Sequence, residues 1–101
     1  MRIEFIEPAE DEFIEAVKYY NEEREGLGFE FAAEVSRTLE RIVQHPKAWT
    51  PLTNRARRCR MNRFPYGIIY QIRPEKILII AIMHFHRHPK TWKSRLNTKD
   101  S

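Results

Sequence analysis

Hydrophobic positions in the first half of the chain follow the spacing of two helices. Residues 2–7 alternate and predict a short strand, and Pro8 then suits the first turn of a helix, where no N–H donor is needed. Apolar side chains next recur every three or four residues, the spacing that places them on one helix face. The first stripe ends at a reversal over 26–28 and the second at His45-Pro46. The two stripes consist of Phe13, Ala16, Val17 and Tyr20, and of Phe31, Ala32, Val35, Leu39, Ile42 and Val43.

The pattern changes to the period of strands in the second half. Residues 46–55 contain two prolines and no period, and they predict a connecting loop. A strand with one basic face is predicted next, because basic and apolar side chains alternate there. Its residues are Arg58, Arg60 and Asn62 on one face and Cys59 and Met61 on the other. Residues 67–73 and 77–83 predict two more strands around a turn at Pro74, and the second, apolar on both faces, is predicted to be central.

These elements predict a single α+β domain with the order β-α-α-β-β-β. An antiparallel sheet is expected to pack on a helical hairpin. A chain of 101 residues has room for one such core. We place the domain over residues 1–96 and a basic, polar tail over 97–101.

Composition excludes several classes of protein. The longest apolar run, 77–83, is far shorter than the ~20 residues that a membrane span needs. The start of the chain has no signal-peptide core, and the single Cys59 cannot form an internal disulfide, which suits a reducing compartment. Motifs for nucleotide, redox and serine-hydrolase chemistry do not occur. We therefore expect a cytoplasmic protein with no cofactor and no membrane contact.

Charge divides the chain into two halves. Residues 1–45 carry twelve acidic and five basic side chains, a balance of −7, whereas 46–101 carry two and thirteen, a balance of +11, which together give the net +4. Such a separation is typical of a surface for nucleic acid or for an acidic protein. The alternative is that both halves are only solvated.

A dense group of arginines lies in the basic half and is followed closely by aromatic residues. Guanidinium groups pair with phosphates or carboxylates, and rings can stack on bases. The alternative is a solvated strand above core aromatics; we favour binding, because five arginines in nine residues exceed what solubility requires. The group comprises Arg55, Arg57, Arg58, Arg60 and Arg63 with Phe64, Tyr66 and Tyr70.

Three histidines, His84, His86 and His88, alternate after the predicted central strand. On an extended chain they would point the same way, as metal ligands do. No acid or cysteine lies nearby in sequence to complete a ligand shell, and Pro89 bends the chain. We therefore predict no metal site. A histidine here could instead act as an acid or base on RNA.

The second half of the sequence resembles the RelE/ParE toxin superfamily, in particular the branch of plasmid-stabilisation proteins. The matching segments are 57–70, which contains Arg-Phe-Pro-Tyr-Gly, 77–83, and 84–92, which contains His-x-x-Arg-x-Pro. The resemblance implies the toxin of a type II toxin–antitoxin pair, which inhibits growth and is neutralised by a cognate antitoxin in a hetero-oligomer. Because the predicted central strand is apolar on both faces, we expect the antitoxin to cover the sheet face away from the helices.

The superfamily contains two activities. RelE-like members cut messenger RNA on the ribosome, whereas ParE-like members inhibit DNA gyrase. Arg87 falls where ribosome-dependent members keep a functional arginine, but Gly67 stands where they keep another, and the tail has Trp92 in place of a terminal tyrosine.

We therefore predict ParE-like action on gyrase. The residues expected to contact the target are Arg57, Arg58, Arg60, Arg63, Tyr66, Arg87 and Trp92. Two alternatives stay open: a RelE-like endoribonuclease, with Arg60, Arg87 and His84 as its catalytic residues, and a non-toxic binding module on the same fold. Whether the protein is an enzyme depends on which of these holds.

Overall fold

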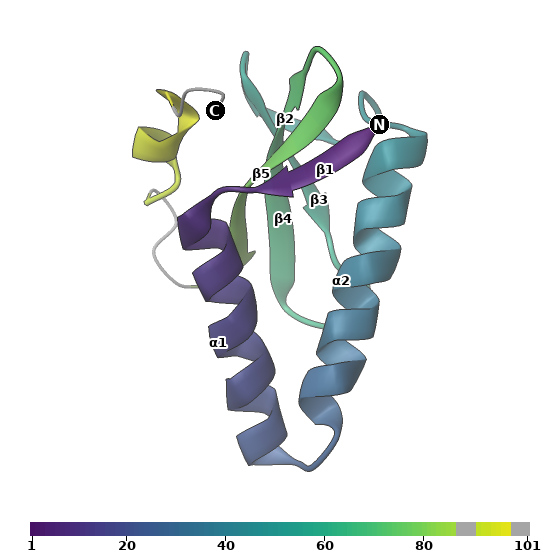
Figure 1. Cartoon of the computed structure of the whole chain (residues 1–101), viewed down its shortest axis with the longest axis vertical. Coiled ribbons are helices and arrows are strands. Elements are labelled where there is room, and N and C mark those ends of the chain that lie inside the picture. The colour runs from purple at the N-terminus through teal and green to yellow at the C-terminus, as the bar shows by residue number, and fades with distance from the viewer. Residues whose placement is uncertain (87–90, 98–101) are drawn as a thin grey trace.

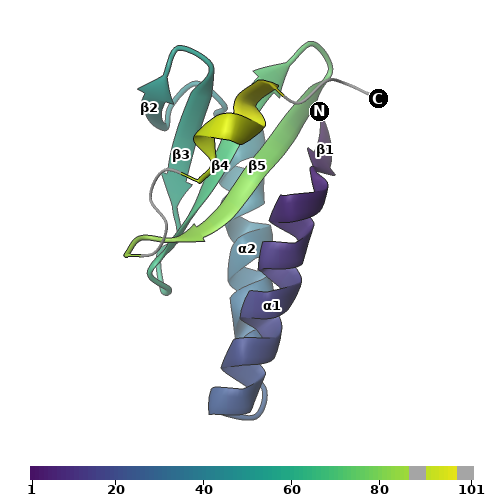
Figure 2. The same cartoon turned by 90° about the vertical axis from the view of Figure 1, so that its left-hand side faces the viewer.

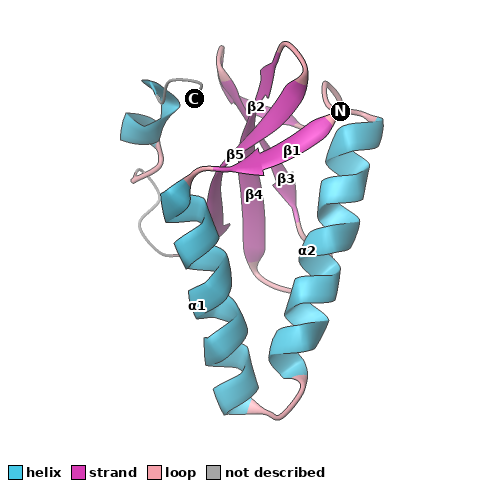
Figure 3. Ribbon diagram, viewed as in Figure 1, coloured by secondary structure: helices cyan, strands magenta, loops and turns pink. Residues whose placement is uncertain are grey.

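The computed structural model describes residues 1–86 and 91–97. A helical hairpin lies beside a five-stranded sheet, and Figure 3 shows the hairpin projecting beyond the sheet at its reversal. The elements, in chain order, are β1 (Arg2–Phe5), α1 (Glu7–Glu23), α2 (Leu27–Gln44), β2 (Thr50–Thr53), β3 (Ala56–Arg60), β4 (Tyr66–Arg73), β5 (Lys76–His84) and the 3₁₀ turn η1 (Lys93–Asn97) (Figure 1).

The sheet has the order β1-β5-β4-β3-β2. Neighbouring strands from β2 to β5 are antiparallel, as predicted, whereas β1 lies parallel to β5, so the sheet is mixed. The α+β fold class is confirmed, with one correction to the predicted loop over 46–55. Residues 50–53 form β2, in which Pro51 is tolerated because an edge strand does not need every N–H.

The reversal between the helices lies slightly earlier than predicted. Helix α1 ends at Glu23, and Leu27 and Gly28 already belong to α2. Gly26 turns the chain with a φ of 85°, which favours glycine. A Cβ on Gly28 would lie 2.2 Å from the carbonyl oxygen of Val17, so glycine here lets the two helices touch.

The main core lies between the helices and one face of the sheet. Helical residues such as Phe31 and Ile42 meet strand residues such as Ile68 and Tyr70 there, all with 0% exposure. The stripes predicted from sequence supply this core. Strand β5 is buried from Lys76 to Met83, which confirms its central position.

The opposite face of the sheet carries a second, smaller core. Trp92 and Leu96 of the η1 region pack with sheet residues that include Ile69, Ile80 and Met83. Figure 2 shows η1, in yellow, lying across the strands on the face away from α2. The chain itself therefore covers part of the face that we expected an antitoxin to cover. No helix among the described residues is long and apolar enough to cross a membrane.

Candidate functional site

The arginines of β3 separate into two groups because side chains alternate across the sheet. Arg57 points to the helix side, where its guanidinium donates hydrogen bonds to the carbonyl oxygens of Lys47 (3.0 Å) and Trp49 (2.8 Å). It thereby holds the segment between α2 and β2. Arg55 lies beyond the strand and donates to Asn97 Oδ1 at 2.9 Å. Neither belongs to a common basic face with Arg58 and Arg60.

Arg58 and Arg60 lie together around the ring of Phe85. The guanidinium carbon of Arg60 lies 4.1 Å from the ring centroid, and that of Arg58 lies 5.7 Å from it. In the described part of the chain neither guanidinium has a carboxylate within ion-pair distance. The Nε of Arg58 is buried without a hydrogen-bond partner among the described residues. Two cations thus keep hydrogen-bond donors for an incoming anion.

Gly67 makes room for this arrangement. It pairs with Arg60 on β3 and with Met83 on β5. A Cβ at this position would lie 3.0 Å from Cε1 of Phe85 and 3.1 Å from Cγ and Cδ of Arg58. The ring and the arginine stem therefore occupy the space in which a side chain of residue 67 would begin. A pocket of about 310 Å³ adjoins them, lined by Leu52, Arg58, Gly67, Ile69, Met83, His84, Phe85, Trp92 and Lys93.

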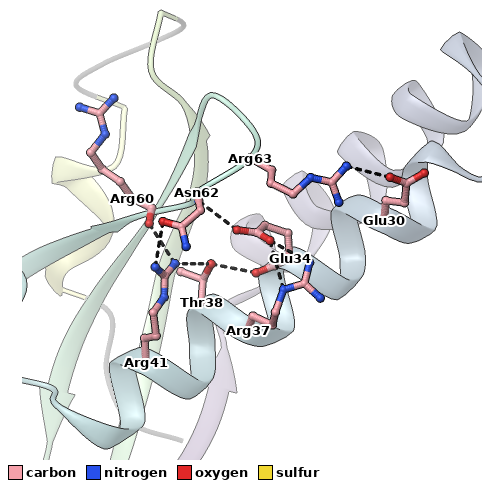
Figure 4. Close-up of polar contacts among 8 residues, drawn as sticks. All are labelled: Glu30, Glu34, Arg37, Thr38, Arg41, Arg60, Asn62 and Arg63. Carbon is pink, nitrogen blue, oxygen red and sulfur yellow. Dashed lines mark hydrogen bonds and ion pairs between the residues drawn. The ribbon is translucent and has the colours of Figure 1, made fainter.

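Helix α2 holds the loop that follows Arg60. The buried carboxylate of Glu34 accepts the backbone N–H of Asn62 at 2.9 Å, and Arg41 donates to the carbonyl oxygen of Arg60 at 3.1 Å. Figure 4 shows the Arg60 side chain pointing away from this network, while its carbonyl oxygen faces Arg41. The network anchors the backbone and leaves the guanidinium of Arg60 outside it.

Electrostatics in this network favour ionised carboxylates. Burial raises the pKa of Glu34, but hydrogen bonds from Arg37 and from the backbone of Asn62 outweigh it, so the pKa lies below its usual value. The hydrogen bond from Arg63 (2.8 Å) lowers the pKa of Glu30. Arg63, predicted to contact a target, is therefore already paired.

The other predicted site residues lie in different surroundings. Tyr66 is 7% exposed, within the aromatic cluster of the main core, and its ring meets that of His84 edge-on at 5.2 Å. Trp92 is 6% exposed in the second core. These two rings face other core residues rather than solvent. Arg87 and His88 lie outside the described residues.

His84 and His86 come close, with ring centroids 5.7 Å apart and the Nδ1 of His84 accepting the backbone N–H of His86 at 3.1 Å. Among the described residues, no three acidic, histidine or cysteine side chains form a metal-binding group. His84 lines the same pocket as Arg58 and Phe85. The two guanidinium groups supply positive charge there for a carboxylate or a phosphate.

The structure brings together two of the predicted residues, Arg58 and Arg60, with Phe85, which sequence reasoning missed. The sequence contained one signal for Phe85 as a site residue: it directly follows the predicted central strand and lies between His84 and His86. The sequence does not show how β3, β4 and β5 pair, and it is this pairing that places Phe85 beside Gly67 and Arg58.

A comparison with solved structures finds a protein of similar fold. The chain is similar to a solved structure described as the chromosomal ParDE TA system from P. aeruginosa, with a TM-score of 0.72 and 11% sequence identity. The match covers 83% of this chain and 95% of that one, so the two share a fold. No curated protein matches the sequence.

The family model for the ParE toxin of the type II toxin–antitoxin system parDE matches residues 3–89. The chain therefore belongs to the ParE toxin family. This confirms the resemblance to the RelE/ParE superfamily that the sequence indicated.

Proposed function

We propose that the chain is a growth-inhibiting toxin of the cytoplasm that acts on DNA gyrase through Arg58 and Arg60. The observation that carries the proposal is the pair of guanidinium groups at Phe85 that lack carboxylate partners among the described residues. Membership of the ParE family supports it. A target with an acidic surface would meet these cations in a site whose backbone is anchored by α2.

The first test reverses the charge of the site. We expect the double variant Arg58→Glu/Arg60→Glu to lose growth arrest on induction, because an acidic pair would repel the target. Arg60 is exposed, where charge changes typically cost under about 0.5 kcal/mol, but Arg58 is half-buried, so a cooperative thermal transition of the double variant must show that it still folds. Arg2→Glu/Lys18→Glu, which changes the net charge equally at exposed positions on β1 and α1, is the matched control and should remain toxic. Full toxicity of the Arg58/Arg60 variant would overturn the proposal.

A second test distinguishes gyrase from messenger RNA as the target. A side chain that stabilises the charge of a transition state typically raises the rate about a hundred- to a thousand-fold. Gly67 has no such side chain at the position where RNA-cutting relatives have an arginine. We expect arrested cells to show reduced supercoiling and a DNA-damage response, and the purified chain to inhibit gyrase in vitro. Abundant new 5′ ends inside reading frames, lost on Arg87→Ala, would instead establish the RelE-like nuclease.

A cognate antitoxin is the proposed partner, and co-expression tests it. Alone, the chain should arrest growth or be poorly soluble. Co-expression with the small protein encoded beside its gene should restore growth and yield a hetero-oligomer, a pairing that would support plasmid stabilisation. Harmless, soluble, high-level expression of the isolated chain would instead favour the non-toxic binding module.

A further inference from the structure

The ring of Phe85 lies within contact distance of both cations of the site. We propose that Phe85 is a positioning residue that holds Arg58 and Arg60 as one receptor for a carboxylate group on an acidic protein surface. The proposal rests on the proposed function, because it assigns a chemical class to the ligand of the same site. It adds a residue that neither the sequence pattern nor the family match assigns.

The position of the ring is determined on two sides. The backbone N–H of Phe85 donates to the carbonyl oxygen of Pro65 at 3.0 Å, which ties the end of β5 to the β3–β4 loop. On the other side Gly67 lets the ring approach the backbone of β4. The backbone of Phe85 and one edge of its half-buried ring are thus both held against the sheet.

The ring lowers the cost of keeping two like charges close together. The face of an aromatic ring carries partial negative charge and attracts a guanidinium within about 6 Å of its centroid. Arg60 at 4.1 Å and Arg58 at 5.7 Å both meet this condition. Their planar forks then need no carboxylate of the chain itself, so they stay available for bidentate binding of an external one.

The surroundings favour a protein carboxylate over a nucleic acid. Binding to duplex DNA commonly engages six to ten phosphates, about one basic side chain for each. Among the described residues, three further arginines are occupied: Arg57 by backbone carbonyls, Arg63 by Glu30 and Arg95 by Glu12. Lys93 adds one more cation to the lining of the adjoining pocket. A compact pair of cations suits one or two carboxylates.

The test measures anion binding without assuming a target. In the full chain, the guanidinium NMR signals of Arg58 and Arg60 are followed while a hexaglutamate peptide is added. In parallel, a single-stranded DNA hexamer with five phosphates is added at the same ionic strength. We expect the peptide to shift both signals together and to bind more tightly than the DNA. Tighter binding of the DNA would overturn the carboxylate assignment.

Variants of Phe85 then test the ring itself. Phe85→Leu keeps apolar volume but removes the ring and should weaken peptide binding about tenfold, whereas Phe85→Tyr should stay within about twofold of the wild type. Equal affinity of the Leu variant and the wild type would overturn the positioning role. If Phe85→Leu fails to fold, Phe85→Met replaces it. Methionine also keeps apolar volume without a ring, and unchanged affinity in this variant would equally contradict the proposal.

Failure of this inference and failure of the proposed function give different results. Loss of growth arrest in Arg58→Glu/Arg60→Glu with full arrest in Phe85→Leu leaves the proposed function intact and removes the role of the ring. The opposite result is also possible. If the NMR signals of Arg58 and Arg60 shift together in the wild-type chain but Arg58→Glu/Arg60→Glu remains fully toxic, the role of the ring is supported and the proposed function is contradicted.

Discussion

Single side chains in this protein act according to contacts far away in sequence. Glu34 looks like one of many acidic residues on a solvated helix, yet it is 3% exposed and holds the loop between β3 and β4. Cys59 and Tyr70 are both fully buried, and burial raises the pKa of the thiol and raises that of Tyr70 to about 12. Both groups therefore stay neutral at physiological pH.

Replacing Glu34 by Gln should destabilise the fold in a manner that depends on pH. The variant loses charge-assisted hydrogen bonds worth about 2 kcal/mol in unfolding free energy at pH 7. The pKa of Glu34 is lower in the folded state, so its contribution is present above the unfolded value near 4.5 and is lost as pH falls through the folded pKa. Urea denaturation across pH should show the two proteins converging progressively as the pH falls below 4.5. A constant difference down to pH 2 would contradict this account.

At the scale of elements, the helical hairpin depends on a close approach of Gly28 in α2 to the backbone of α1. Gly28 lies in the first turn of α2, and its backbone N–H donates to Asn21 Oδ1 at 2.8 Å. The backbone of Val17 and the side chain of Asn21 fill the space beside Gly28, so no side chain fits at residue 28. Gly26, two residues earlier, borders open space, since a Cβ added to it would have nothing within 4 Å, but it takes a left-handed backbone conformation. The two glycines are therefore needed for different physical reasons.

Alanine substitutions should separate these reasons. Gly28→Ala places a Cβ against the backbone of α1, which cannot yield locally, and should lower the unfolding free energy by about 3 kcal/mol. Gly26→Ala meets open space and should cost only about 1–2 kcal/mol, the penalty for a left-handed alanine. Chemical denaturation of both variants measures the difference. Equal losses would mean that the helices can separate at Gly28 without cost.

For the whole molecule, one ion pair connects the C-terminal segment to the first helix. Arg95 and Glu12 form a bidentate pair with distances of 2.9 and 3.1 Å. Strand β1 pairs with β5 only as far as Ile79. Beyond that point Arg95 donates to the carbonyl oxygen of Ile80, and Glu12 accepts the backbone N–H of Ile82, each at 3.1 Å. The pair therefore covers the part of the central strand that β1 leaves open.

Breaking this pair should loosen the second face of the sheet. Arg95→Ala removes the guanidinium donor from Glu12, which keeps the N–H of Ile82, and from the Ile80 carbonyl, and it should cost about 2–3 kcal/mol of unfolding free energy. Amide exchange at Ile82 should become faster than at residues of β4. Arg24→Ala removes an exposed pair with Glu30 and serves as the control, with a loss of at most about 1 kcal/mol. Unchanged exchange at Ile82 in Arg95→Ala would show that packing of Trp92 and Leu96 alone holds the segment.

The sequence by itself determined the elements and the family. Helical periodicity located α1 and α2, alternation located β3, and an uninterrupted apolar run located β5, because these signals arise within ten to twenty neighbouring residues. Strand alternation also placed Arg58 and Arg60 on one face of β3. The short motifs around residues 57–92 were sufficient to indicate the toxin superfamily.

Only the tertiary structure decided how these elements are combined. The parallel pairing of β1 with β5 joins residues more than seventy positions apart, and β2 forms because β3 offers an edge to a segment without periodicity of its own. The same long-range pairing brings Phe85 to Gly67 and Arg58, and it assigns Arg63 to Glu30. Periodicity records which way a side chain points along its own element. The partner that it meets depends on how strands and helices pack, which is settled by burial and pairing across the whole chain.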